Sequence, residues 1–175
     1  MIQLDLFRTT ERVELGIDCF DISKVEELKI DTHKEQRRKF VEKVELLRQL
    51  PSDTYIMYKT GAYHKDREKY PEPIYPYLFD MERNVEVPVS LTRTNYPTFA
   101  IPTRFLNLPK GVNFCFLAHR LAAHCFLAND EPNHKVTVDH IDGDKLNYEV
   151  SNLEWVSYSE NNKRSYEQKQ KEKKK

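Results

Sequence analysis

The sequence has no apolar run that approaches the roughly 20 residues of a membrane-spanning helix. It also lacks a basic region followed by an apolar one at Met1–Asp5, so a secretory signal is not expected. There are only 3 cysteines, Cys19, Cys115 and Cys125. Because that number is odd and the residues are scattered, reduced thiols are favoured over a disulfide framework. We therefore expect an intracellular protein that is independent of membranes.

The chain also lacks net charge, with 28 basic and 28 acidic residues among its 175 positions. The average alone gives no indication of a nucleic-acid partner. The distribution is more informative, because residues 163–175 contain 7 basic and 2 acidic residues. A local positive field is enough to attract a phosphate backbone. The length fits one domain with a small extension.

The segment from Asp21 to Leu50 predicts an amphipathic helix, or two shorter ones. Apolar residues recur there at steps of three and four, at Phe40, Val41, Val44, Leu47 and Leu50. Pro51 then ends the pattern. Basic residues at 34–43 lie on or beside the other face, and either a solvated face or a helix that contacts DNA would explain them.

Residues 54–116 predict a small antiparallel sheet with irregular loops. Short β-rich runs alternate with proline-rich joints; the runs are 55–58, 77–79, 85–91 and 98–101. Residues 4–17 alternate loosely and allow a strand pair. Aromatic and basic residues mix at 63–70 and, more weakly, at 93–104, which suits either base stacking with phosphate contact or a solvated loop.

Residues 112–127 predict a strand that turns directly into a helix. His119, His124, Cys115 and Cys125 raise the question of a zinc site, but their spacing matches no paired Cys-x-x-Cys pattern. We expect these side chains to pack beside or under the next segment of the chain.

That next segment, residues 136–164, predicts a strand, a long turn, a second strand and a helix. Asp142-Gly143 is typical of a tight turn, because glycine accepts a positive φ and aspartate bonds nearby backbone. Leu153–Val156 is predicted as the returning strand. Ser157 or Ser159 can cap the helix that follows, and Glu160 suits its first turn.

This segment also carries a plausible hydrolytic set. The Asp139 carboxylate and the Asn161 amide are the hard oxygen ligands that Mg²⁺ prefers. His140 has a side chain that titrates near neutral pH and can accept a proton from water. Asp139 and His140 point to opposite faces of a regular strand, so we expect a twist or bulge to bring both to one phosphate.

These residues resemble the catalytic module of HNH nucleases, most closely the branch found in phage and intron-encoded homing endonucleases. The resemblance runs from about residue 117 to 164 and is carried by four anchors: residues 118–121, 139–143, 152–156 and 160–161. It implies a ββα-metal (His-Me finger) module, so we expect an α+β protein in which an N-terminal helix and a small antiparallel sheet precede that module. The family pattern usually differs at Asp144 and Tyr148, which leaves the turn geometry and any DNA contact there undetermined.

The resemblance further implies metal-dependent hydrolysis of DNA with one Mg²⁺ or Mn²⁺ ion per active site. His140 would be the general base, Asp139 and Asn161 would hold the metal, and Asn152 would fix the hairpin and orient the histidine. Five further residues are candidates for contact with nucleic acid: His119, Arg120, Lys145, Lys163 and Arg164.

The predicted organisation has four parts: an N-terminal extension at 1–52, a β-rich region at 53–111, the HNH module at 112–164 and a basic tail at 165–175. Two alternatives remain open. One is a non-catalytic nucleic-acid-binding or assembly protein on the same scaffold. The other is a nuclease that acts on RNA or on a particular nucleic-acid structure, since nothing in the residues separates DNA from RNA.

Overall fold

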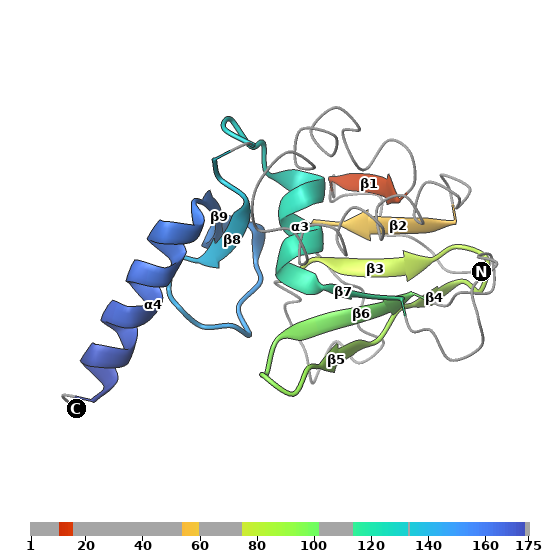
Figure 1. The fold of residues 1–175 in the computed structure, drawn as a ribbon. Helices are drawn as coiled ribbons and strands as arrows, with labels where there is room; N and C mark the ends of the chain where they lie inside the picture. The colour runs from red at the N-terminus through yellow and green to blue at the C-terminus, as the bar shows by residue number, and fades with distance from the viewer. Residues whose placement is uncertain (1–10, 16–53, 60–74, 102–113, 133, 174–175) are drawn as a thin grey trace.

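A computed structural model describes residues 11–15, 54–59, 75–101, 114–132 and 134–173. The predicted helix at 21–50 and the aromatic and basic stretch at 63–70 lie outside these residues. So do Cys19 and Arg104. Figure 1 shows a body of strands joined through one helix to a C-terminal hairpin and a second helix.

The first sheet has four antiparallel strands in the order β1-β2-β3-β4: β1 (Arg12–Leu15), β2 (Tyr55–Tyr58), β3 (Tyr77–Asp80) and β4 (Val85–Glu86). Met57 pairs with Leu78, and Met57, Leu78 and Tyr55 are fully buried. Because β-branched and aromatic residues fit a half-buried pleated surface, the predicted strands at 55–58 and 77–79 form where expected. β1 pairs with β2, and the other residues of the strand pair that the loose alternation at 4–17 allowed lie outside the described part of the chain.

The second sheet has three antiparallel strands in the order β5-β6-β7: β5 (Val89–Leu91), β6 (Pro97–Ile101) and β7 (Phe114–Leu117). The single run predicted at 85–91 is therefore wrong, because the structure divides it between β4 in one sheet and β5 in the other. Pro88 lies at the break, where its missing N–H cannot support a continuing ladder. The one small sheet predicted from the sequence is in fact two sheets.

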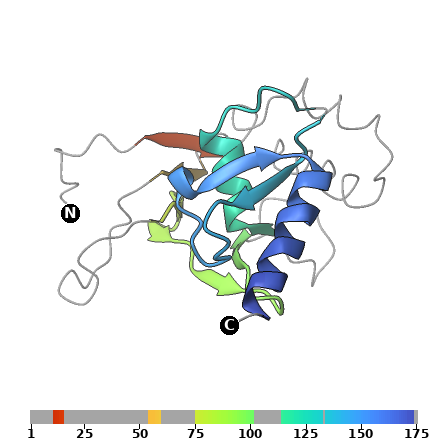
Figure 2. The ribbon, with the colours of Figure 1, turned by 90° about the vertical axis from the view of Figure 1, so that its left-hand side faces the viewer.

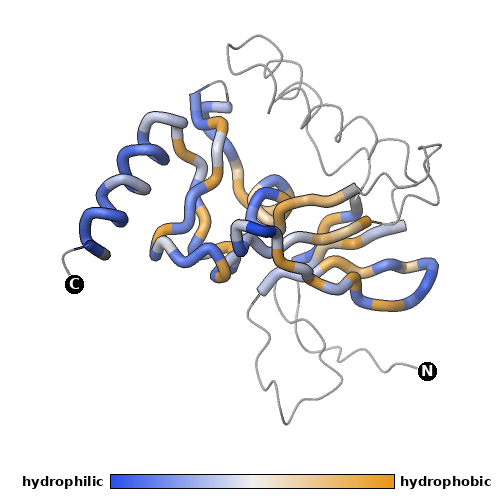
Figure 3. The backbone as a smooth tube through the Cα atoms, turned by 60° about the horizontal axis from the view of Figure 1, so that its bottom comes forward, coloured by the Kyte–Doolittle hydropathy of each residue, from blue (hydrophilic) through white to orange (hydrophobic). Residues whose placement is uncertain are grey.

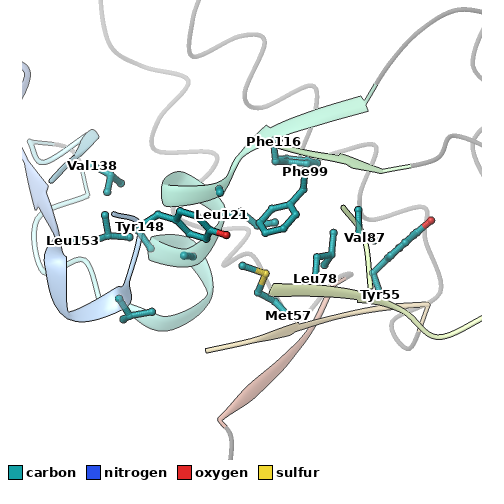
Figure 4. Packing of buried hydrophobic residues seen from close by; sticks show 14 of the residues in the cluster. Tyr55, Met57, Leu78, Val87, Phe99, Phe116, Leu121, Val138, Tyr148 and Leu153 are labelled. Atoms are coloured by element: carbon teal, nitrogen blue, oxygen red, sulfur yellow. The ribbon is translucent and has the colours of Figure 1, made fainter. Parts of the chain in front are cut away.

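Helix α3 (Ala118–Phe126) follows β7 directly and contacts β6, β7 and the C-terminal hairpin. Its residues Ala118, Leu121, Ala122 and Ala123 are buried. Figure 4 shows Leu121 between the aromatic and aliphatic side chains of the sheets on one side and those of the hairpin segment on the other. The buried side chains of both parts belong to one cluster, which includes Phe99, Phe116, Leu78, Val138 and Leu153. α3 therefore joins the upstream sheets to the hairpin through a shared core.

The C-terminal hairpin pairs β8 (Thr137–His140) with β9 (Leu153–Val156), and a short 3-10 turn η4 (Val150–Asn152) precedes β9. Helix α4 (Tyr158–Glu172) begins immediately afterwards and runs beside the hairpin (Figure 2). The Ser157 hydroxyl accepts a bond from the Glu160 backbone N–H, and the Glu160 carboxylate accepts one from the Ser157 N–H. Ser157, not Ser159, is thus the cap, and it forms a complete capping box.

The surface of α4 is mostly hydrophilic, whereas the strands of the two sheets carry many of the hydrophobic residues (Figure 3). The mixed α+β class, the antiparallel sheets and the C-terminal β-β-α segment are confirmed. The division into four parts at 52, 111 and 164 stays a prediction. In the part of the chain that the structure describes, no helix has both the length and the apolar character needed to span a bilayer.

Candidate active site

Asn152 ties the two ends of the hairpin loop together. Its side-chain oxygen accepts a hydrogen bond from the Asp142 backbone N–H at 3.1 Å. Its amide nitrogen donates to the Asp142 carboxylate at 2.9 Å and to the Asn147 carbonyl at 2.8 Å. The Asn152 carbonyl accepts a further bond from the Ile141 N–H at 2.9 Å. One side chain therefore fixes the loop that begins directly after β8.

The loop itself contains the predicted tight turn. Asp142 accepts a bond from the Asp144 N–H at 2.8 Å, and its pKa is lowered by the bonds from Asn152, Asn147 and Asp144, which outweigh its desolvation. Gly143 has a φ of +76°, the left-handed region that other residues enter at a cost. A Cβ built on Gly143 would also meet the end of the Gln168 side chain on α4. The turn and the helix thus approach closely at this glycine.

Asp139 and His140 lie on opposite faces of the hairpin. β8 and β9 pair in regular register through Asp139 opposite Glu154 and His140 opposite Leu153, so the predicted bulge does not occur within the strand. The Asp139 carboxylate faces α4, where the Arg164 guanidinium lies 3.4 Å from its Oδ2. The same guanidinium pairs closely with Glu154. Two acidic side chains and one arginine therefore share the face between the hairpin and α4.

His140 ends β8 and is turned towards α3. His140 is 7% exposed, His119 on α3 is 3% exposed, and their two ring centroids are 4.7 Å apart. Within the described residues, neither His140 Nε2 nor His119 Nδ1 has a hydrogen-bond partner. Burial is the main reason that the pKa of His119 falls to about 3, and the neighbouring His140 lowers it further.

Burial also lowers the pKa of His140, although the nearby carboxylates of Asp139, Asp142 and Asp144 raise it in part. Both imidazoles are therefore neutral at physiological pH. A neutral imidazole with an unpaired nitrogen has a lone pair that can accept a proton. The pair thus places a potential base at the end of β8.

Tyr96 completes the aromatic cluster, and the sequence did not assign it to the site. Its ring centroid lies 5.2 Å from that of His119 and 6.2 Å from that of His140. The Lys145 ammonium group lies 4.7 Å from the Tyr96 ring centroid, in the geometry of a cation–π contact. The predicted nucleic-acid contact Lys145 is therefore an exposed residue beside the histidine pair.

Asn161 occupies the first turn of α4 and is half-buried. α4 contacts β8, the strand that carries Asp139. Among the described residues, no three His, Cys, Asp or Glu side chains gather as a metal cluster. Asn161 would contribute an amide oxygen instead, and a site of one carboxylate and one amide suits an ion that keeps most of its water.

The other residues that were predicted to contact nucleic acid lie on two helices, α3 and α4. Lys163 is exposed on α4, whereas Arg164 is occupied by the two carboxylates described above. Arg120 on α3 is partly buried, and burial lowers its pKa while Tyr96 raises it. Its Nε has no hydrogen-bond partner within the described ranges.

The remaining candidates for a zinc site pack as side chains of the core and its rim. His124 lies edge-on to Trp155 with ring centroids 4.7 Å apart. Cys115 and Cys125 are present as thiols. The expected packing of His119 and His124 beside the hairpin is confirmed.

Comparison with known proteins finds a match that spans the end of β7, α3, the hairpin and the start of α4. The family model HNH_3, described as HNH endonuclease, matches residues 116–163. A protein of Acanthamoeba polyphaga mimivirus named "Uncharacterized HNH endonuclease L247" is 54% identical over 43 residues, which is 25% of this chain and 11% of that protein. A solved structure titled "DNA binding and cleavage by the HNH homing endonuclease I-HmuI" aligns with 53% of this chain and 48% of its own, at 22% identity and a TM-score of 0.41. Residues 116–163 of this chain are thus similar to the HNH endonuclease family, and the chain spans only a small part of the mimivirus protein that it matches.

Proposed function

We propose that the protein is a metal-dependent endonuclease that hydrolyses phosphodiester bonds of DNA. The observation that carries the proposal is the His140 imidazole packed against the His119 ring, with the two centroids 4.7 Å apart, where burial lowers the pKa of His140. It sits at the end of a hairpin strand next to the half-buried carboxylate of Asp139. The match of residues 116–163 to the HNH endonuclease family supports the same activity.

In this proposal His140 is the general base. Its lone pair takes the proton of the attacking water, and burial keeps the imidazole neutral so that the lone pair is available near pH 7. Asn152 holds the loop after β8 through Asp142 and Asn147, which fixes the backbone that follows His140. The hydrogen bonds of Asn152 therefore support an orienting role.

Asp139 and Asn161 would hold the metal ion, Mg²⁺ or Mn²⁺. The chemistry of the donors fits, because a carboxylate and an amide oxygen are the hard ligands that such an ion prefers. When bound, such an ion stabilises the charge that develops on the phosphate and the leaving oxygen. In this arrangement β8 would supply the carboxylate, and the start of α4, which contacts β8, would supply the amide.

DNA would approach over exposed basic residues of the hairpin loop and of α4. Lys145 lies beside the histidine cluster and Lys163 is exposed on α4. Each lysine near a phosphate adds a salt-sensitive increment of affinity that does not depend on sequence. The partly buried Arg120 and the paired Arg164 are further candidates for phosphate contact, the latter after release from Glu154.

The test is nicking of supercoiled plasmid in Mg²⁺ by the wild type and by His140→Ala, with His134→Ala as the matched control. His134 is exposed and lies before the hairpin. We expect nicking by the wild type and by His134→Ala, and its loss in His140→Ala. Equal nicking by all three proteins would remove His140 as the base. Parallel reactions on single-stranded DNA and on RNA identify the preferred nucleic acid.

A second candidate is a nucleic-acid-binding protein without catalysis. The ion pair between Arg164 and Asp139 favours it, because it occupies the proposed metal ligand with a side chain of the protein itself. This candidate predicts unchanged DNA affinity in Asp139→Ala and no cleavage by the wild type in Mg²⁺ or Mn²⁺. Cleavage that disappears in Asp139→Ala would exclude it.

A further inference from the structure

Tyr96 is the one member of the histidine cluster that comes from outside the family segment at 116–163. It lies at the end of the turn between β5 and β6, in the second sheet. A residue that touches both His119 and His140 from another part of the chain can restrict how their rings move. The site would then be composed of the HNH segment and the upstream sheet together.

The turn that carries Tyr96 is held by several hydrogen bonds. The Tyr96 N–H donates to the Thr92 hydroxyl at 3.0 Å, and the Thr92 N–H donates to the Tyr96 carbonyl at 2.9 Å. The Asn95 N–H donates to the Thr92 carbonyl, and Asn95 takes up the positive φ of 63° that the turn needs. Because the backbone on either side of Tyr96 is fixed, the direction of its Cα–Cβ bond is fixed as well, and the contacts with the two histidines set the ring.

The three rings form a closed set of contacts. His119 and His140 are 4.7 Å apart, and Tyr96 lies within 6.2 Å of both. All three pairs are tilted, the arrangement that aromatic quadrupoles favour over a face-to-face stack. His140 Nε2 has no hydrogen-bond partner within the described residues, so contacts with the neighbouring rings restrict the imidazole on that side.

Lys145 joins this set from the hairpin loop. Its ammonium group lies over the Tyr96 ring, so Tyr96 also connects the loop after β8 to the second sheet. The loop is thereby held at its base by Asn152 and farther along by the contact of Lys145 with Tyr96. Both contacts restrict the chain that immediately follows His140.

We propose that Tyr96 is a positioning residue for His140, which holds the imidazole in its reactive orientation through ring contacts with His119 and His140. The inference rests on the proposed function for its catalytic consequence, since it takes His140 to be the base. The aromatic ring of Tyr96 positions His140, and its hydroxyl does not take part. A phenylalanine at position 96 therefore fulfils the same role. Loss of the ring lowers the rate of the chemical step more than it weakens DNA binding.

The experiment compares Tyr96→Phe and Tyr96→Leu with the wild type, with Tyr75→Leu as the matched control. Tyr75 stacks on Tyr148 at 4.9 Å, so Tyr75→Leu also removes one aromatic contact, but none with the histidines. Single-turnover nicking is measured over a range of DNA concentrations, which separates the maximal rate from the half-saturating concentration. Imidazole proton resonances of His119 and His140 are recorded at one neutral pH as a measurement that needs no activity.

For Tyr96→Leu we expect a maximal rate lower by roughly 10- to 100-fold, with the half-saturating DNA concentration within about threefold of the wild type. Tyr96→Phe and Tyr75→Leu should retain the wild-type rate. The resonances of both histidines should lose their ring-current shifts in Tyr96→Leu and keep them in Tyr96→Phe.

Three results would overturn the positioning role: an unchanged rate in Tyr96→Leu, a change confined to the half-saturating concentration, or histidine resonances that do not respond to the loss of the ring. Failure of the proposed function looks different. In that case the wild type does not nick DNA, or His140→Ala nicks it equally well, while the resonances still report whether Tyr96 packs on the two histidines.

Discussion

Acidification should destabilise the protein through the buried His119 well before its carboxylates are protonated. The pKa of His119 falls from the usual 6.5 to about 3 in the folded chain, chiefly because burial disfavours the charged ring. A group with a depressed folded pKa binds protons more readily in the unfolded state. The contribution of the neutral His119 to the free energy of unfolding is therefore fully present above pH 6.5 and is lost as the pH falls towards 3.

The size of the effect follows from the two pKa values. Lowering the pH from about 7.5 to about 5 should reduce the free energy of unfolding by about 2 kcal/mol through His119 alone. His140 adds to the loss, because burial lowers its pKa in the same direction. The pKa values of Asp142 and Glu160 are lowered too. Their contribution to the stability of the fold is lost only as the pH falls below their usual pKa values of 3.8 and 4.5.

The assay is urea unfolding at several pH values over that interval, followed by far-ultraviolet circular dichroism. Fluorescence of Trp155, the only tryptophan, is less suitable because His124 lies against its ring and can alter its emission when protonated. His119→Gln should have a pH dependence that is smaller by about 2 kcal/mol, whatever its stability at neutral pH. His134→Gln, altered at an exposed site, should keep the wild-type dependence. If His119→Gln shows the full wild-type slope, the assignment of the effect to this histidine is wrong.

Three further predictions concern the hairpin and α4, each read as the free energy of urea unfolding at neutral pH. Asn152→Ala should cost about 1–3 kcal/mol, because the Asp142 N–H and the Asn147 carbonyl lose their partner; an unchanged midpoint would contradict this role. Gly143→Ala should cost about 1–2 kcal/mol at its positive φ, and Gly143→Asn less, since asparagine tolerates that region. Ser157→Ala should cost about 1 kcal/mol and Ser157→Thr little; equal losses in both would argue against the cap.

Local patterns in the sequence predicted the local structure of the C-terminal half well. The strands around Val138 and Trp155, the turn at Gly143 and the helix after Ser157 all depend on neighbours a few residues apart. Turn chemistry, alternation and capping act over that range, so they can be recognised from one sequence. The hydrogen bonds of Asn152 also agree with the loop-fixing part of the role that the family resemblance implies.

Contacts that depend on the tertiary fold could not be predicted in the same way. Tyr96 is 44 positions before His140 in the chain, and nothing in the composition of its turn indicates that it meets a histidine. The division of residues 85–91 between two sheets had a signal in Pro88, but proline marks only a break and not the new partner. The pairing of Arg164 with Asp139 and Glu154 likewise requires α4 to lie along the hairpin.

The position of α3 limits whether residues 116–163 could be moved into another protein on their own. Residues such as Leu121 and Ala122 share one cluster with the sheets as well as with the hairpin. A fragment cut at residue 116 would leave that side of the helix bare to water, at about 25 cal/mol for each Å² of apolar surface newly uncovered. A stable fragment would therefore have to include the strands upstream of α3, and with them the turn that carries Tyr96.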